Sequence, residues 1–413
     1  MNKVNKFIDI IKWFYPGMHI KRWIILSGFG ILLIVVGSAQ FKTERLFLVQ
    51  VLYGIVVISG VTLLVLGIKR MLRSVLMIFI PQRDTNIMDL MYQKRQLERG
   101  PRIVTVGGGT GLSVILSGLK EYTSNITAIV TVADSGGSSG RLREQFDILP
   151  PGDIRNCLVA LADAPLLMRD LFQFRFDKNS EFAGHNFGNL FITVMTQLTG
   201  DFEKAIKESS RVLAIRGQVI PSTLSNVTLV AQHQNGSTTE GEDRIPKAEK
   251  PIEKVYLRPG DSLPTPEAIK AIEEAQIIVL GPGSLYTSII PNLLIKGITE
   301  RIVASDAMKI YVCNIMTQHG ETDGYSAYDH LNALIKHSHP KVLDYCLVNN
   351  AKLPEELVER YKQEKSYPIA IDQRKIRAMG YRLIEDEIVI TEGYIRHDPV
   401  RLAKIILGLT EEA

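Results

Sequence analysis

Two long runs without a charged residue dominate the start of the chain. Trp23–Ala39 spans 17 residues and Leu46–Ile68 spans 23. A helix that crosses a membrane needs ~20 apolar residues, within a range of ~17–25. The pattern therefore predicts two transmembrane helices, at about residues 23–39 and 46–68, with Gln40–Arg45 as the turn between them.

The distribution of Lys and Arg orients this predicted pair. The turn holds only two basic residues, whereas the flanks hold Lys3, Lys6, Lys12, Lys21, Arg22, Lys69, Arg70 and Arg73. Because basic flanks stay in the cytoplasm, we expect a multi-pass protein of the inner membrane whose main domain is cytoplasmic. Two alternatives stay open: a signal peptide cleaved after Ala39, and a pair of buried core helices.

The apolar pattern also divides the chain into segments. Residues 1–80 are expected to be a membrane anchor, in which Met71–Ile80 is a short amphipathic interfacial helix ended by Pro81. Residues 81–101 are charged and are expected to be a linker, and residues 102–413 a single nucleotide-binding domain.

From Arg102 onward, short β-branched runs alternate with helical patterns. Strands are expected at 103–106, 127–132, 227–231, 277–280, 310–312 and 345–348, and helices at 112–121, 154–161, 190–198, 202–213, 266–274, 325–337, 355–362 and 399–407. Such alternation predicts an α/β fold with a mainly parallel sheet covered on both faces. Ligands of these sheets bind beyond the carboxyl ends of the strands. The polar stretch Gln234–Pro251 is expected to be a hairpin tip or a loop.

Charge and cysteine content narrow the function class. Residues 1–102 hold 15 Lys and Arg against 5 Asp and Glu, and the remainder holds 33 against 39. An acidic body argues against a nucleic-acid partner, and a basic front favours a membrane surface. Cys157, Cys313 and Cys346 have no C-x-x-C spacing, which argues against a disulfide framework or a zinc site and favours buried thiols in a reducing compartment.

A glycine-rich turn follows the first predicted strand of the body. Its candidate phosphate ligands are Gly107, Gly108, Gly109, Thr110 and Gly111. The turn departs from the G-x-G-x-x-G fingerprint because Leu112 stands at the third glycine position, and it lacks the Lys of a Walker A loop. Three glycines in succession let a backbone approach a phosphate closely. The alternative is a plain turn between a strand and a helix.

A carboxylate ends the second predicted strand. Asp134 is placed to hold a ribose hydroxyl or a phosphate-bound metal, and it is the catalytic candidate if the protein is an enzyme. An open donor-rich loop is expected after it, with candidate ligands Ser135, Gly136, Gly137 and Arg141. The alternative is a solvated surface loop.

Four later segments add candidate ligands. Asp153 is a predicted helix N-cap, with Arg155 and Asn156 in the first turn. The side-chain amides of Asn186 and Asn189 can form hydrogen bonds with a base or a sugar. A second glycine turn suits a second phosphate at a helix start, with candidate ligands Gly281, Gly283, Ser284 and Thr287. Near the C-terminus, Arg396 is a candidate phosphate clamp.

Five segments together resemble a known family. They are GGGTGLS at 107–113, VADSGGSSGRLR at 132–143, PPGDIRNCLVAL at 150–161, GPGSLYTSIIPNLL at 281–294 and NIMTQHGETDGYSAYDHL at 314–331. They resemble the gluconeogenesis factor (YvcK-type) family, which is related to the 2-phospho-L-lactate transferases (CofD-type). The resemblance covers about residues 102–409 and implies a Rossmann-like three-layer α/β/α body. The two apolar runs imply a membrane-tethered version.

The resemblance also carries functional expectations. It implies a UDP-sugar-binding regulator, with a ligand such as UDP-N-acetylglucosamine, of cell shape, cell-wall synthesis and growth on gluconeogenic carbon. It places Asp134 where the transferases have a carboxylate implicated in acceptor binding, and it ties Arg396 to UDP-sugar binding. Ser135 stands where many members have a second acidic residue, so a Mg²⁺ site at Asp134 is left open.

Three classes of function therefore remain at this point. The first is the UDP-sugar-binding regulator, and the second is a phosphotransferase of the 2-phospho-L-lactate transferase type acting on a nucleotide-linked substrate. The third is an NAD-dependent oxidoreductase, which the missing third glycine disfavours. No cofactor is required by the pattern, and the oligomeric state is open, including a homo-oligomer.

Overall fold

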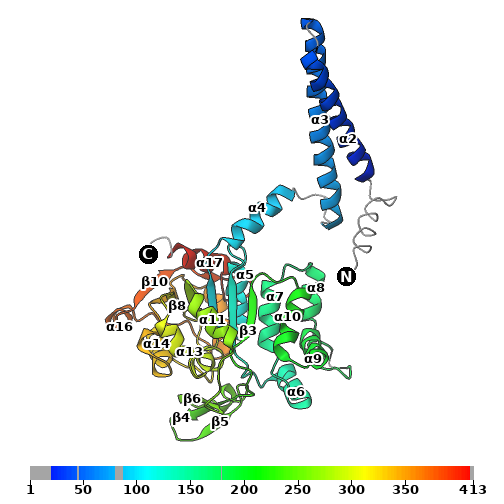
Figure 1. Cartoon of the computed structure of the whole chain (residues 1–413). Coiled ribbons are helices and arrows are strands. Elements are labelled where there is room, and N and C mark those ends of the chain that lie inside the picture. Colours follow the sequence, from blue (N-terminus) through cyan, green and yellow to red (C-terminus); the bar gives the residue numbers. More distant parts are fainter. Residues whose placement is uncertain (1–19, 44–45, 80–86, 178, 410–413) are drawn as a thin grey trace. The chain divides into compact units, whose positions relative to one another are not determined.

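The computed structural model describes residues 20–43, 46–79, 87–177 and 179–409. The chain divides into two compact units, Met1–Met91 and Tyr92–Ala413, which we call the hairpin unit and the body (Figure 1). Of the basic residues used to orient the apolar segments, Lys3, Lys6, Lys12 and Arg45 lie outside the described residues, and so does Pro81.

Two long helices form the hairpin unit, as the apolar runs predict. They are α2 (Ile20–Thr43) and α3 (Phe47–Phe79). Each contains a stretch long and apolar enough to cross a membrane, Arg22–Phe41 and Phe47–Met71, and only 11% of either window is buried. That exposure argues against a pair of core helices. The separate interfacial helix expected at Met71–Ile80 is wrong, because α3 runs through to Phe79 with no Pro or Gly to interrupt it after Gly67.

Glycines spaced seven residues apart bring α2 and α3 together. A Cβ on Gly60 would lie 2.7 Å from the Gly30 carbonyl oxygen, and a Cβ on Gly30 would lie 2.7 Å from the Gly60 oxygen. Gly37 and Gly67 face the partner helix at similarly short range. Small residues allow this backbone contact between apolar helices. Near one end, the Arg70 guanidinium lies 4.8 Å from the centre of the Trp23 ring.

A seven-stranded parallel sheet forms the centre of the body. Its order is β10-β9-β8-β7-β1-β2-β3. The strands are β1 (Ile103–Gly107), β2 (Ile126–Val130), β3 (Gln218–Pro221), β7 (Ile277–Leu280), β8 (Met308–Val312), β9 (Tyr345–Asn349) and β10 (Arg382–Asp386). Every pairing between neighbours is parallel, with Gly107 opposite Val130 and Val106 opposite Leu280 at the carboxyl ends of β1, β2 and β7.

The order of the strands reverses between β1 and β7. From β1 the chain moves outward through β2 to β3, and from β7 it moves outward in the other direction through β8 and β9 to β10. Because crossovers between parallel strands are right-handed, this reversal puts the helices of the two halves on opposite faces. The result is the three-layer α/β/α body that the sequence predicts, and the reversal marks the usual ligand position in such sheets.

Helices cover both faces of the sheet (Figure 1). In the first half they are α5 (Gly109–Leu119), α6 (Gly137–Phe146), α7 (Gly152–Leu161), α8 (Leu166–Gln173), α9 (Phe187–Thr199) and α10 (Phe202–Val212), and α17 (Pro399–Gly408) packs against α5. The second half contributes α11 (Pro266–Glu274), α12 (Ile290–Leu293), α13 (Ile298–Ala304), α14 (Ala327–Lys336), α15 (Glu355–Gln363) and α16 (Gln373–Ala378). A further helix, α4 (Ile87–Glu98), precedes β1 within the segment predicted as a linker.

A small antiparallel sheet stands apart from the main one. It has the order β5-β4-β6, from β4 (Thr228–His233), β5 (Thr238–Glu240) and β6 (Ile252–Arg258). The strand predicted at 227–231 therefore exists but belongs to this sheet. A two-stranded ribbon, β11 (Val389–Ile390) with β12 (Arg396–His397), precedes α17. Every residue of β1, β2 and β7 is buried, as are all three cysteines.

The glycine contact in the hairpin unit can be tested with a matched pair of substitutions. Gly60→Leu should push α3 away from α2, whereas Gly28→Leu should not, because a Cβ on Gly28 meets nothing within 4 Å. Overpacking of this kind costs about 1–3 kcal/mol. In a Trp13→Phe background, Trp23 is the single remaining tryptophan of the sequence, so its fluorescence reports the contact with Arg70. In an SDS titration, the fluorescence midpoint should fall for Gly60→Leu alone, and equal midpoints would contradict the contact.

Candidate functional site

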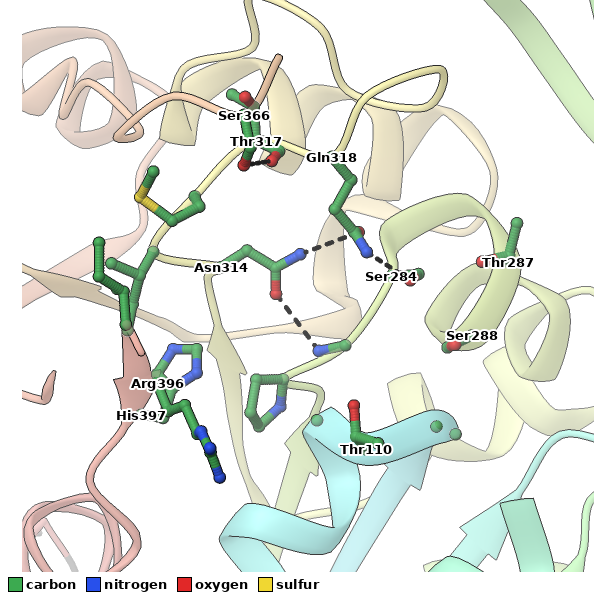
Figure 2. A pocket seen from close by; sticks show the side chains of 18 of the residues that line it. Thr110, Ser284, Thr287, Ser288, Asn314, Thr317, Gln318, Ser366, Arg396 and His397 are labelled. Carbon is green, nitrogen blue, oxygen red and sulfur yellow. Dashed lines mark hydrogen bonds between the residues drawn. The ribbon is translucent and has the colours of Figure 1, made fainter. Parts of the chain in front are cut away.

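A cavity of about 540 Å³ opens at the carboxyl ends of β1, β2, β7 and β8 (Figure 2). It therefore lies at the point where the strand order reverses. Its walls are formed by Gly108, Gly109, Thr110, Gly111, Asp134, Asp153, Glu242, Pro282, Gly283, Ser284, Thr287, Ser288, Asn314, Ile315, Met316, Thr317, Gln318, Tyr361, Ser366, Ile395, Arg396 and His397.

The two glycine turns meet on one side of this cavity. A Cβ on Gly111 would lie 2.6 Å from the Pro282 carbonyl oxygen and 2.8 Å from the Gly283 Cα. No other residue at position 111 leaves the two backbones this close. The pairing of β1 with β7 holds the turns together, since each turn directly follows one of these strands.

The first turn presents the start of α5 to the cavity. The helix begins at Gly109, and no side chain caps it from Gly108. Asp153 accepts a hydrogen bond from the Gly109 N–H. Gly108 has no room for a side chain, because a Cβ there would lie 2.5 Å from the Asp153 Oδ2. The uncapped end of an eleven-residue helix is the place where backbone N–H groups can bind an anion.

At the second turn a carboxyl group of the chain occupies more of the donors. The turn leads into a π-helical segment, η2 (Leu285–Ile289). The buried Glu321 carboxylate accepts hydrogen bonds from the N–H groups of Tyr286 and Thr287, and the Thr287 hydroxyl donates to it at 3.2 Å. Burial raises the pKa of Glu321 to about 7. The Thr287 N–H and hydroxyl, expected to help bind a second phosphate, are thus already paired.

Side-chain amides connect the second turn to the loop after β8 (Figure 2). The Gly283 N–H donates to the Asn314 Oδ1 at 3.3 Å, and the Asn314 amide donates to the Gln318 Oε1 at 3.3 Å. Gln318 in turn donates to the Ser284 hydroxyl at 2.7 Å. The chain of amides fixes the orientation of both side chains on the cavity wall.

Three carboxyl groups form another wall. Burial is the main cause that raises the pKa of Asp134, raises that of Asp153 to about 7 and raises that of Glu242 to about 8. Repulsion from Asp134 adds to the shift of both Asp153 and Glu242. The Gly136 N–H opposes the shift at Asp134, to which it donates at 2.9 Å. Near neutral pH this wall therefore carries less negative charge than three free carboxylates would.

Arg396 and His397 from β12 lie across the cavity from Thr287 and Ser288 (Figure 2). The Arg396 guanidinium carbon is 5.2 Å from the centre of the Tyr394 ring, and the side chain is exposed. The His397 Nε2 lies 3.1 Å from the Cys313 carbonyl oxygen, and burial lowers the pKa of His397 to about 4. Arg396 is thus the cation of this wall, and His397 stays neutral at physiological pH.

Ten of the residues predicted from the sequence line the cavity. They are Gly108, Gly109, Thr110, Gly111, Asp134, Asp153, Gly283, Ser284, Thr287 and Arg396. Asp153 is not the helix N-cap that the sequence predicts, because α7 begins at Gly152 and Pro151 precedes it. Its carboxyl group turns instead toward the first glycine turn.

The other ten predicted residues lie off the cavity wall. Gly107 and Gly281 are backbone neighbours of it, and the loop expected at Gly136–Gly140 is instead the start of α6, with Gly136 as N-cap. Ser135 donates to Asp243, and Arg141 donates to the Ala183 carbonyl. Gly137 is the first residue of α6. The remaining side chains have partners inside the protein: Arg155 donates to Asn156, Asn186 caps α9, and Asn189 donates to Ser139.

Several cavity residues were not assigned a role from the sequence. Asn314 and Gln318 lie inside the segment 314–331, and its resemblance to the family is the sequence feature that points to a role for them in the site. Glu242 lies in the polar stretch between β5 and β6, and nothing local points to it. Tyr361 is on α15, and its hydroxyl accepts from the Ile395 N–H at 3.2 Å. No group of three His, Cys, Asp or Glu side chains able to hold a metal ion is found among the described residues.

The family described as 2-phospho-L-lactate transferase CofD matches residues 103–389. A curated relative from Nostoc sp. is 44% identical over 98% of this chain and 93% of its own length. The gluconeogenesis factor of Bacillus subtilis is 47% identical over 76% of this chain and 99% of its own length. The match to the Nostoc protein includes the hairpin unit. The match to the Bacillus subtilis protein is about as long as the body alone.

The fold also has a solved counterpart. A crystal structure of a UPF0052 family member from Bacillus halodurans superposes with a TM-score of 0.73 and 46% identity. It covers 75% of this chain and 99% of that chain.

The carboxyl wall predicts a pH-dependent stability of the body. The folded chain keeps a proton on Glu242 up to a pH of about 8, whereas the unfolded chain releases it near 4.5. The free energy of unfolding should therefore fall as the pH rises between these values. Hydrogen exchange of the buried β1 and β7 amides measures this free energy of unfolding as a function of pH.

Glu242→Gln should flatten this pH profile, leaving a smaller slope from Asp153 and Glu321. Glu392→Gln, at an exposed position, is the control and should keep the wild-type slope. A wild-type slope in Glu242→Gln would show that Glu242 does not hold its proton in the folded chain.

Proposed function

This chain belongs to the gluconeogenesis factor family and has a CofD-like domain, and from that premise we propose that its cavity binds a UDP-sugar such as UDP-N-acetylglucosamine. The observation that carries the proposal is the position of the uncapped start of α5 at the reversal between β1 and β7. The protein would then act as a ligand-binding regulator of cell shape, cell-wall synthesis and growth on gluconeogenic carbon.

The chemistry of the walls supports a ligand with several different parts. The α5 start suits a diphosphate, and Arg396 adds the positive charge that a phosphate prefers. Asn314 and Gln318 carry both donors and acceptors, which suit the edge of a nucleobase. The carboxyl wall of Asp134, Asp153 and Glu242 suits sugar hydroxyls. A volume of about 540 Å³ falls within the ~300–1,000 Å³ usual for small-molecule sites.

Mg²⁺ fits this site only together with the ligand. The described residues offer no three-ligand cluster, but Mg²⁺ is commonly bound by one or two carboxylates plus substrate phosphates. Asp134 is the carboxylate that would hold it. Bound there, the ion would offset the repulsion between the acidic wall and a diphosphate.

We further propose that the hairpin unit anchors the protein in the inner membrane with the body in the cytoplasm. The length and apolar composition of α2 and α3 support this, together with the excess of Lys and Arg on both flanks. A tether of this kind would keep a UDP-sugar sensor next to the enzymes that consume such precursors.

Binding measured by calorimetry tests the proposed ligand. The purified full-length protein should bind UDP-N-acetylglucosamine saturably, and Arg396→Ala should weaken it about 10- to 100-fold, the cost of one hydrogen bond to a charged group. Asp134→Ala should weaken binding roughly tenfold or more, with a larger effect when Mg²⁺ is present. Arg374→Ala and Asp177→Ala, both at exposed positions, are matched controls.

The same experiment separates the regulator from an enzyme. Unchanged UDP-N-acetylglucosamine after hours with the protein supports the regulator. The family described as 2-phospho-L-lactate transferase makes a transferase the alternative. Turnover of a GDP-lactate-type donor with a deazaflavin acceptor, in the absence of UDP-sugar binding, would replace the proposal.

Membrane anchoring makes a separate prediction. The full chain should remain in the membrane pellet after alkaline carbonate extraction, and a chain that lacks residues 1–80 should be soluble and keep its affinity for the ligand. Release of the full chain by carbonate would rule out spanning helices. Loss of binding in the truncated chain would mean that the first 80 residues contribute to the site.

A further inference from the structure

Another cavity of the body lies at the opposite edge of the main sheet from the candidate site. It has a volume of about 740 Å³ and opens where the chain enters β8, β9 and β10, at Met308, Tyr345 and Arg382. We call it the Lys309 cavity. The candidate site opens at the carboxyl ends of the parallel strands, and no residue lines both cavities. A ligand can therefore bind in each of them separately.

The side chain that gives this cavity its name is only 10% exposed. The ammonium group of Lys309 lies 4.0 Å from the Asp344 Oδ2, which is too long for a hydrogen bond. Among the described residues, the Lys309 Nζ has no hydrogen-bond partner. Because removing an ammonium group from water costs free energy unless the group is hydrogen-bonded, Lys309 holds unused donors beside an open space.

The backbone explains why Asp344 does not approach this ammonium group more closely. The Asp344 Oδ2 accepts a hydrogen bond from the Lys309 N–H at 2.9 Å, and the Asp344 N–H donates to the Lys309 carbonyl at 2.8 Å. The Arg382 N–H donates to the Asp344 carbonyl at 3.0 Å. These bonds fix the starts of three strands and hold the carboxylate at the cavity wall, where it is half-exposed.

Two more cations line the Lys309 cavity. They are Lys341, on the short helix η3 (Pro340–Val342), and Arg382, the first residue of β10. Both side chains are exposed, and neither forms an ion pair within the part of the chain that the structure describes. Asp306 adds a carboxylate to that of Asp344. With three positive and two negative side chains, the lining favours an anion.

Two tyrosine rings give the cavity a part that is less polar. The Tyr381 hydroxyl donates to the Pro340 carbonyl at 2.8 Å, and the Tyr345 hydroxyl accepts from the Arg382 guanidinium at 2.7 Å. The Arg382 guanidinium carbon also lies 5.4 Å from the centre of the Tyr345 ring. Both rings are thus held in place, and the volume leaves room for an organic group beside the anion.

We propose that the Lys309 cavity binds a phosphate monoester, and that Lys309 and Asp344 together select a phosphate group that keeps one proton. The ammonium group donates to the phosphate oxygens, since no group of the protein uses its hydrogen atoms. A carboxylate only accepts hydrogen bonds, so Asp344 calls for a donor on the ligand, and the P–OH group of a monoanionic phosphate supplies it. The second pKa of such an ester is ~6. A sulfate ester has no proton at that pH and would be repelled by Asp344.

Hydrogen exchange, followed by mass spectrometry on the full chain in detergent, tests this site locally. At pH 6, phenyl phosphate at about ten times its dissociation constant should slow exchange about tenfold in peptides that cover 305–312 and 340–347. Phenyl sulfate should have no effect there. A peptide that covers 108–119 reports any separate binding at the candidate site. Protection of the two cavity peptides by both anions alike, or by neither, would overturn the proposal.

Inorganic phosphate, in a parallel measurement, separates the ester from the free ion. Weaker protection than with phenyl phosphate at equal concentration supports the ester, because Tyr345 and Tyr381 then contribute to binding. Equal or stronger protection would show that the organic group is not bound, and the assignment to a monoester would be wrong.

Lys309→Met tests the cation, because it keeps an apolar side chain of similar length without the charge. The variant should lose the protection by phenyl phosphate, and Lys254→Met, at an exposed position outside the cavity, should keep it. In the absence of any anion, the buried β8 amides of Lys309→Met should exchange no faster than those of the wild type. Faster exchange would show that the pair with Asp344 stabilises the fold by itself, and would contradict the role given to Lys309.

Asp344→Asn tests the selection of a protonated phosphate. An asparagine can still accept the Lys309 N–H, and its amide can donate to an anion that has no proton. Phenyl sulfate should therefore protect the cavity peptides of this variant, whereas Asp261→Asn, an exposed control, should behave as the wild type does. Continued exclusion of phenyl sulfate by Asp344→Asn would overturn the role of Asp344.

Discussion

The contact between two backbone turns at the carboxyl ends of β1 and β7 is the constraint on which the rest of the cavity depends. Gly111 touches the carbonyl of Pro282 because neither turn places a side chain between them. The pairing of β1 with β7 brings this contact to the reversal of the strand order. Much of the cavity lining lies on the loops that follow β1, β2, β7 and β8 at this edge of the sheet.

Hydrogen-bond donors and charged side chains are distributed unequally between the two sides of the cavity. At the start of α5 the Gly109 N–H donates to Asp153, whereas at η2 the N–H groups of both Tyr286 and Thr287 donate to the buried Glu321. The carboxyl wall lies beside the α5 start, and the cation Arg396 lies on β12. The donors that the sequence offers at the second turn are therefore less available to an anion than those at the start of α5.

The sequence predicts the parts of this structure that depend on local pattern. Apolar runs mark β1, β2, β7, β8 and β9, and the two glycine turns are identified at the strand ends where they occur. β3 (Gln218–Pro221) and β10 (Arg382–Asp386) are missed because each of these edge strands carries only two aliphatic residues, and their place is decided by pairing with β2 and β9.

The cavity residues, too, divide into those that local sequence pattern predicts and those that depend on distant parts of the chain. Glycines and the helix start are local features, so Gly108–Gly111 and Gly283 are found, whereas Glu242 arrives from a separate sheet and no local signal predicts its position. Asp153 is identified but given the wrong role, because its carboxyl group turns to the Gly109 N–H rather than to its own helix. Arg141 and Asn186 have the right chemistry for a ligand and are used internally.

The central strand pair has a consequence for how the protein is made. The hydrogen bond from the Arg102 N–H to Gln276 joins residues 174 positions apart, at the entrance to the β1–β7 ladder. During synthesis β1 leaves the ribosome long before its partner, so one edge of a strand that is fully buried in the folded body stays unpaired while the intervening helices form. Distant pairings of this kind fold slowly and expose the nascent chain to misassociation. Chaperone dependence of newly made chains should accordingly trace to the interval before residue 280 is translated.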